Sequence, residues 1–131
     1  MLRGFLHNKC PYIKVVLVGT SEEEIEVLVD TGFNGYLTLP EELAVKLGLT
    51  KTNAVTSSSM ADGSSSPSII YRGTVVYNDM HILNTIVEVQ PQCKTLLGMS
   101  LLAELGLNLF IDLGANRVEL DTSGKKLAQG T

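Results

Sequence analysis

The chain has 131 residues, of which 44% are hydrophobic and 18% charged, and its formal net charge is −4. This length fits one domain that can bury roughly two thirds of its extended-chain surface. No apolar run approaches the ~20 residues of a membrane span, and an acidic chain without a basic stripe is a poor partner for nucleic acid. We therefore expect a single globular domain whose partners include no nucleic acid and no membrane.

The N-terminal segment and the cysteines both indicate a cytoplasmic protein. Residues 1–9 carry one arginine and one lysine without a long apolar core, so they do not read as a secretory signal peptide. Cys10 and Cys93 are the only two cysteines, which is too few for a disulfide framework and suits a reducing compartment. A single bridge between them stays open as an alternative.

The first predicted element is a β-hairpin. β-Branched and apolar residues predominate at 12–18 and again at 25–29, and the polar segment 20–23 follows a glycine between them. Apolar runs on both sides of a polar turn are typical of two antiparallel strands.

An acidic turn and a short helix follow this hairpin. The second apolar run ends at Asp30, and another short strand is predicted at 36–39. Pro40 suits the first helical position, and Gly48 suits the C-terminal cap of the same helix. A carboxylate at the end of a buried strand loses hydration, so backbone N–H donors, a shared proton or a metal must compensate it. The turn at Asp30 is therefore either a functional site or an ordinary solvated turn.

The segment 50–68 has a different composition from the rest of the chain. Runs of serine flank an Ala-Asp-Gly turn at 61–63, and an Asp-Gly turn between short segments is a hairpin signal. Serine-rich arms contribute little to a core. The segment is therefore either a mobile flap over a cleft, which needs low local stability to open, or a solvated loop.

The second half is predicted to be mainly β with one more short helix. The expected elements, in chain order, are strands at 69–76 and 80–89, a polar loop at 90–94, a helix at 100–105, and strands at 107–111 and 117–120. Ser100 suits the N-cap of the helix and Gly106 its C-terminal end. The domain is predicted to span 1–121, and the polar segment 122–131 is expected to be a flexible tail.

Three motifs resemble those of the retropepsin-like (clan AA) aspartic proteases and occur in the same order as in that family. The resemblance spans about residues 12–120. Val29-Asp30-Thr31-Gly32 resembles the active-site motif, and its continuation with Phe33 resembles the microbial branch. Leu96-Leu97-Gly98 ahead of a helix resembles the second landmark, and Met60-Ala61-Asp62-Gly63 resembles the flap tip. The resemblance implies a mainly β fold, a retropepsin-like acid protease half-barrel with a flap hairpin and two short helices.

The resemblance also implies an aspartic endopeptidase that acts on a peptide or protein substrate as a homodimer. Two carboxylates that share one proton can activate water and polarise a carbonyl, yet the chain offers one Asp-Thr-Gly. Asp30 of a second copy would supply the other carboxylate across a symmetric interface.

The neighbouring residues take roles from the same resemblance. Thr31 would stiffen the paired loops, and Gly32 would let them approach closely. Phe33, where viral and pepsin-type enzymes usually place a small residue, would line a substrate pocket or pack beneath the loop. Residues 60–63 would close over an extended peptide, and Leu97 and Gly98 would pack under the loop.

Other readings of the sequence compete with this one. The fold could serve as a dimerisation or peptide-binding module without proteolysis, or as a monomeric β domain in which Asp30 is a turn residue. The segment Ile111-Asp112-Leu113-Gly114 partly resembles the motif but lacks the threonine. Asp112 is therefore expected to be a hairpin residue. His7 and His81 flank no cysteine or acidic cluster, so neither a metal nor another cofactor is expected.

Overall fold

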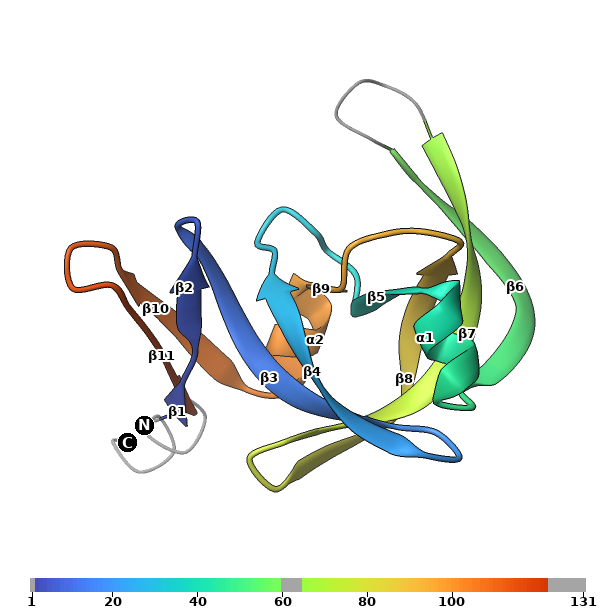
Figure 1. Ribbon diagram of the computed structural model, residues 1–131, viewed down its shortest axis with the longest axis horizontal. Coiled ribbons are helices and arrows are strands. Elements are labelled where there is room, and N and C mark those ends of the chain that lie inside the picture. Colours follow the sequence, from blue (N-terminus) through green and yellow to red (C-terminus); the bar gives the residue numbers. More distant parts are fainter. Residues whose placement is uncertain (1, 60–64, 123–131) are drawn as a thin grey trace.

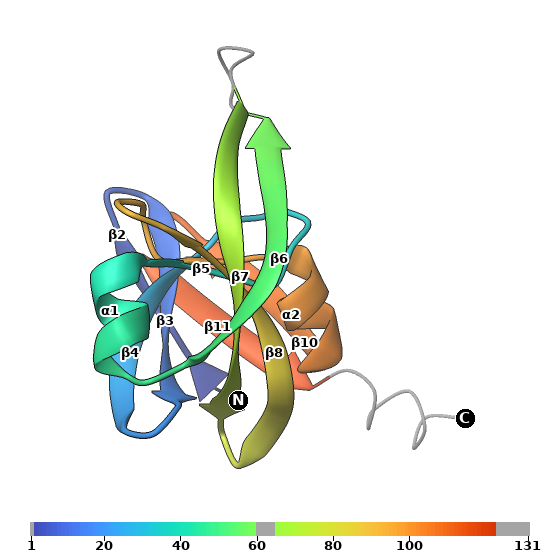
Figure 2. The ribbon, with the colours of Figure 1, turned by 90° about the vertical axis from the view of Figure 1, so that its right-hand side faces the viewer.

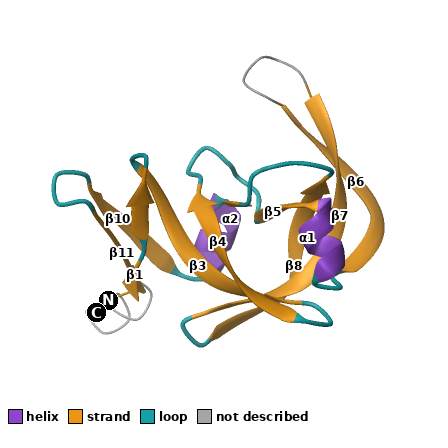
Figure 3. Cartoon of the chain, in the orientation of Figure 1, coloured by secondary structure: helices purple, strands orange, loops and turns teal. Residues whose placement is uncertain are grey.

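The computed structural model describes residues 2–59 and 65–122, and Figures 1 and 3 show that strands predominate over two short helices. The N-terminal half contains β1 (Leu2–Arg3), β2 (Phe5–His7), β3 (Cys10–Val18), β4 (Glu22–Val29), β5 (Leu37–Pro40), α1 (Glu41–Lys46) and β6 (Thr50–Ser59). The C-terminal half contains β7 (Ser65–Tyr77), β8 (Met80–Gln90), β9 (Leu96–Leu97), α2 (Met99–Glu104), β10 (Leu107–Asp112) and β11 (Arg117–Thr122). The prediction of a mainly β fold with two short helices is confirmed.

Six strands close into a ring of hydrogen-bonded pairs. The ring runs from β3 through β4, β9, β5, β8 and β7, and β7 returns to pair with β3. Strands β2 and β6 continue this sheet beyond the ring. A separate three-stranded sheet, in the order β1-β11-β10, lies at the left of Figure 1 beside β2.

The core fills the ring because apolar residues alternate along its strands. A strand directs successive side chains to opposite faces, and in β3 and β4 every second residue is buried while glutamates and a lysine occupy exposed positions between them. The buried members of these two strands are Ile13, Val15, Leu17, Ile25, Val27 and Val29. Their register, from Tyr12 opposite Leu28 to Val18 opposite Glu22, confirms the predicted first hairpin.

Both helices end just before a glycine, as expected, whereas the starts of both helices differ from expectation. Gly48 and Gly106 adopt the left-handed conformation, each with φ +66°, and end the two helices as predicted. Pro40 is the N-cap of α1, with φ −70° and ψ 148°, because β5 extends through it. Gly98, and not Ser100, is the N-cap of α2.

The arms of the serine-rich hairpin are paired. Strands β6 and β7 are antiparallel from Thr50 opposite Arg72 to Ser59 opposite Ser65, and they project beyond the barrel in Figure 2. Val55, in the middle of β6, is 66% exposed, as expected of arms that contribute little to a core. The predicted flap-tip residues 60–63 lie outside the described residues.

Within the described part of the chain, no helix is long and apolar enough to cross a membrane.

Truncation of the core should destabilise the protein, whereas truncation of an equally large exposed leucine should not. Leu39→Ala removes a side chain with no exposed surface, and we expect it to lower the free energy of unfolding by about 2–5 kcal/mol. Leu83→Ala removes a side chain that is 70% exposed, and it should change that free energy by less than about 0.5 kcal/mol. Urea unfolding at one fixed protein concentration, followed by circular dichroism, compares them. Equal losses would contradict this account of the core.

Candidate active site

Asp30 follows β4 directly and begins the loop 30–36 that leads to β5. Its backbone N–H donates to the Leu97 carbonyl at 2.9 Å, and its own carbonyl accepts from the Phe33 N–H at 3.1 Å. The Asp30 side chain is half-buried, and its Oδ1 accepts a hydrogen bond from the Gly32 N–H at 2.9 Å. A backbone donor therefore compensates part of the lost hydration, which is one of the means expected for this carboxylate.

The start of α2 holds the other end of the loop. The amides of Gly98, Met99 and Ser100 donate to the carbonyls of Tyr36, Phe33 and Gly35, at 2.9, 2.8 and 3.1 Å respectively. The first amides of a helix have no partner within the helix, so the loop satisfies donors that would otherwise need another acceptor. Loop and helix start thus stabilise each other.

Ser100 adds a side-chain contact that the sequence did not predict. Its hydroxyl donates to the Asn34 carbonyl at 2.5 Å, so the side chain fixes the loop and does not cap its own helix. Ser100 and Asn34 are 66 positions apart in the chain. No local pattern relates residues so far apart, which is why the contact escaped sequence reasoning.

Phe33 packs against two glycines of the site. A Cβ placed on Gly35 would lie 2.5 Å from the Phe33 Cζ, and one placed on Gly98 would lie 2.7 Å from the Phe33 Cδ2. The aromatic ring therefore occupies the space that side chains at these positions would take. Glu88, which sequence reasoning did not single out, also reaches this place, since its Oε2 would lie 2.6 Å from the same Gly35 Cβ.

Thr31 and Gly32 are exposed in the single chain. A Cβ on Gly32 would find the Asp30 Oδ1 at 3.4 Å as its nearest neighbour, which is an ordinary contact distance. The chain's own packing therefore does not require glycine at position 32. The sequence predicts another reason for glycine at position 32, namely close approach by the loop of a second copy. That reason concerns the exposed side of this loop.

The remaining candidate residues are placed as follows. Asp112 accepts a hydrogen bond from the Ala115 N–H at 3.0 Å, as the predicted hairpin residue. Cys10 and Cys93 are free thiols, and burial raises the pKa of the Cys93 thiol. Across residues 2–59 and 65–122, no group of three or more histidine, cysteine or acidic side chains could hold a metal ion.

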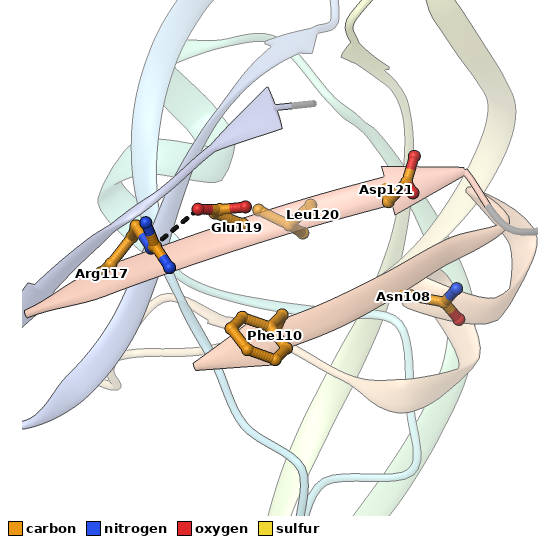
Figure 4. A pocket seen from close by; sticks show the side chains of 6 residues that line it. All are labelled: Asn108, Phe110, Arg117, Glu119, Leu120 and Asp121. Atoms are coloured by element: carbon orange, nitrogen blue, oxygen red, sulfur yellow. Dashed lines mark ion pairs between the residues drawn. The ribbon is translucent and has the colours of Figure 1, made fainter. Parts of the chain in front are cut away.

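A hollow of about 420 Å³ lies away from the Asp30 loop, on the face of the β10–β11 hairpin. Figure 4 shows its lining, which comes from these two strands alone: Asn108, Phe110, Arg117, Glu119, Leu120 and Asp121. The Arg117 Nε lies 2.8 Å from the Glu119 Oε1 within it. The hollow therefore belongs to the small sheet and not to the barrel.

Solved structures show what this fold resembles. A retropepsin-like aspartic protease from Rickettsia conorii matches with a TM-score of 0.60 and 26% identity, over 92% of this chain and 88% of that one. An inhibitor-bound EIAV protease matches with a TM-score of 0.65 and 24% identity, over 81% of this chain and 99% of that one. No protein-family model and no curated protein matches the sequence. The chain has the retropepsin-like fold.

The close contact at Gly98 should make this position intolerant of a side chain. A Cβ there would lie 2.2 Å from the Gly35 carbonyl oxygen, so Gly98→Ala must displace the loop, and we expect a loss of about 1–3 kcal/mol in the free energy of unfolding. Gly114→Ala is the matched control, because its Cβ would meet its nearest atom at 3.5 Å. Thermal unfolding compares the two, and an unchanged Gly98→Ala protein would contradict the described packing.

Proposed function

We propose that this chain, with its retropepsin-like fold, is an aspartic-type endopeptidase that acts as a homodimer. The observation that carries the proposal is the anchoring of Asp30: its backbone is fixed to Leu97 while its carboxylate bonds only locally, to the Gly32 N–H, among the described contacts. A carboxylate held in this way at the end of a buried strand is suited to chemistry, since its position is set by backbone contacts and not by a flexible turn.

The proposed reaction needs a second carboxylate. Like charges about 3 Å apart cannot both ionise easily, so two Asp30 carboxyls at a twofold axis would share one proton and titrate as a unit. The ionised carboxylate would take a proton from water, and the protonated carboxyl would hydrogen-bond the peptide carbonyl oxygen. The hydroxyl oxygen would bond to the carbonyl carbon while the carbonyl oxygen takes the proton of the protonated carboxyl, which gives a tetrahedral diol. The carboxyl that took the proton of water would then protonate the nitrogen, and the other carboxylate would accept one diol proton, so that the C=O bond re-forms as the C–N bond breaks. No cofactor enters these steps.

The other candidate residues take supporting parts in this proposal. Exposed Thr31 and Gly32 would face the loop of the second copy, where the absence of a Cβ at Gly32 permits close approach. The substrate would be an extended peptide that lies between this loop and the projecting β6–β7 arms, held by backbone hydrogen bonds as an added strand. Phe33 would shape the adjoining subsite through its packing on Gly35. We also propose a cytoplasmic location, which the two free thiols support.

Removal of the proposed dyad should abolish cleavage without unfolding the protein. Asp30→Asn keeps the acceptor for the Gly32 N–H but loses the acid–base function, so we expect kcat/KM to fall by at least about 100-fold. Asp79→Asn is the matched control, because Asp79 lies exposed in the β7–β8 turn with φ +66°, a conformation that asparagine tolerates. Mass spectrometry of a peptide library incubated with each protein at pH 4–7 measures the cleavage rates of the parent and both variants.

Two outcomes would contradict the proposal. An Asp30→Asn protein that cleaves as fast as its parent would remove Asp30 from the mechanism. A parent protein that binds peptides or a pepstatin-like inhibitor yet cleaves nothing in the library would instead be a binding module of the same fold.

A further inference from the structure

Glu88 brings a carboxylate to the Asp30 loop from a distant strand. A Cβ placed on Gly35 would lie 2.6 Å from the Glu88 Oε2 and 2.5 Å from the Phe33 Cζ. The carboxylate and the aromatic ring therefore lie next to each other, in the space that a side chain at position 35 would take. Both side chains are partly exposed, so a ligand that binds beside the loop can reach them.

The strand pattern turns Glu88 away from the core. Its neighbours on β8, Val87 and Val89, are buried with 0% and 3% exposure. Successive residues of a strand point to opposite faces of the sheet. Glu88 is therefore a polar group on the face opposite to these core residues, and its charge is not enclosed in the barrel.

The sheet places Glu88 between the Asp30 loop and the projecting arms. Glu88 lies opposite Thr38 of β5, the strand that follows the loop, and opposite Ile70 of β7. The β7–β8 pairing ends one residue further on, and from there toward the tip β7 pairs, among the described strands, with β6 alone. Figure 1 shows β5, β8 and β7 together at the right, beneath the arms. Glu88 therefore lies at the base of the arms, beside the proposed path of the peptide.

The two cross-strand neighbours of Glu88 bring no positive charge to this place. Ile70 is apolar. The Thr38 hydroxyl donates its proton to the Lys94 carbonyl at 2.7 Å and accepts from the Leu96 N–H at 3.0 Å. These strands therefore present an acidic group, bordered by apolar surface, to whatever binds beside the loop.

We propose that Glu88 determines substrate specificity, because it makes the subsite beside Phe33 and Gly35 select a long basic side chain, arginine or lysine, of the bound peptide. This inference rests on the proposed function and deepens it, since it names the class of peptide that the site takes. Glu88 binds the substrate in this account and takes no part in the chemical steps.

The pair of Phe33 and Glu88 matches the two parts of such a side chain. Lysine and arginine lay an apolar stem along apolar surface and direct the charged head to a polar group. The Phe33 ring would contact the stem, and the Glu88 carboxylate would accept charge-assisted hydrogen bonds from the head, which are stronger than bonds between neutral groups. A carboxylate has about four acceptor sites, so these bonds can form beside the contacts that Glu88 already makes.

An acidic side chain of the peptide would be rejected at the same subsite. Like charges close together repel, and most strongly where partial burial reduces the screening by water. A glutamine of the peptide would gain no charge-assisted bond, but it would not be repelled either. The subsite should therefore favour arginine or lysine over glutamine, and glutamine over glutamate.

Cleavage of peptides that differ at one position tests the role of Glu88. Each peptide of the set carries arginine, glutamine or glutamate at one position of an otherwise constant sequence, and mass spectrometry at pH 6 gives its kcat/KM. For the parent, one position should favour arginine over glutamate by at least about tenfold. Glu88→Gln should lower this ratio to less than about threefold, because the charge is lost, and Glu88→Arg should reverse the preference.

The ratio is measured within one protein, so a change in the amount of folded or associated protein does not alter it. Glu24→Gln is the matched control, because Glu24 is an exposed glutamate near the start of β4, at the other end of that strand from Asp30. It should keep the ratio of the parent. A Glu88→Gln protein that also keeps this ratio, or a parent without such a preference at any position, would overturn the inference.

Binding of the same peptides separates this inference from the proposed function. Fluorescence polarisation with the Asp30→Asn protein gives Kd without cleavage, and Asp30→Asn combined with Glu88→Gln is the comparison. A parent that cleaves no peptide, with Asp30→Asn binding arginine peptides at least about tenfold more tightly than glutamate peptides through Glu88, would support the role of Glu88 and contradict the peptidase proposal. Cleavage with a ratio that Glu88→Gln leaves unchanged would do the reverse. A protein that neither cleaves nor binds any peptide would overturn both.

Discussion

The hydrogen bond from the Asp30 amide to the Leu97 carbonyl is the contact on which the rest of the site depends. Strand β9 has two residues, yet it lies between β4, to which it is parallel, and β5, to which it is antiparallel. Leu97 is fully buried, so core packing and the hydrogen bonds of two neighbouring strands fix its position together. Any shift of Leu97 would move Asp30, the loop that follows and the start of α2 at once.

Under the proposed function, one chain would supply one of the two carboxylates that the reaction needs. Backbone hydrogen bonds hold the loop at Asp30, Phe33, Gly35 and Tyr36. Thr31 and Gly32 are exposed. A single carboxylate cannot act as base and acid in the same step, so the proposed chemistry would require a second copy.

Local patterns predicted the parts of the fold that local residues determine. Runs of β-branched and apolar residues predicted β3, β4, β8 and most of β7. The serine-rich β6 lacks such a run, so the sequence left it open between a flap arm and a solvated loop. Gly48 and Gly106 predicted the helix ends, because a left-handed residue must be tolerated there. The candidate site was found for the same reason: Asp30, Thr31 and Gly32 are consecutive. The strands β1, β2 and β9 were missed, since two or three residues have no periodicity and pair only in the folded chain. Ser100 and Glu88 were missed as site residues because they reach the loop from distant positions.

The most direct measurement of the central claim is a crystal structure of the associated protein with a peptide-like inhibitor bound. The account predicts a twofold axis at which the Asp30 carboxyls of two subunits lie about 3 Å apart, with the inhibitor between them and the β6–β7 arms. A structure in which each Asp30 stays remote from any second carboxylate, in every assembly the crystal contains, would contradict it.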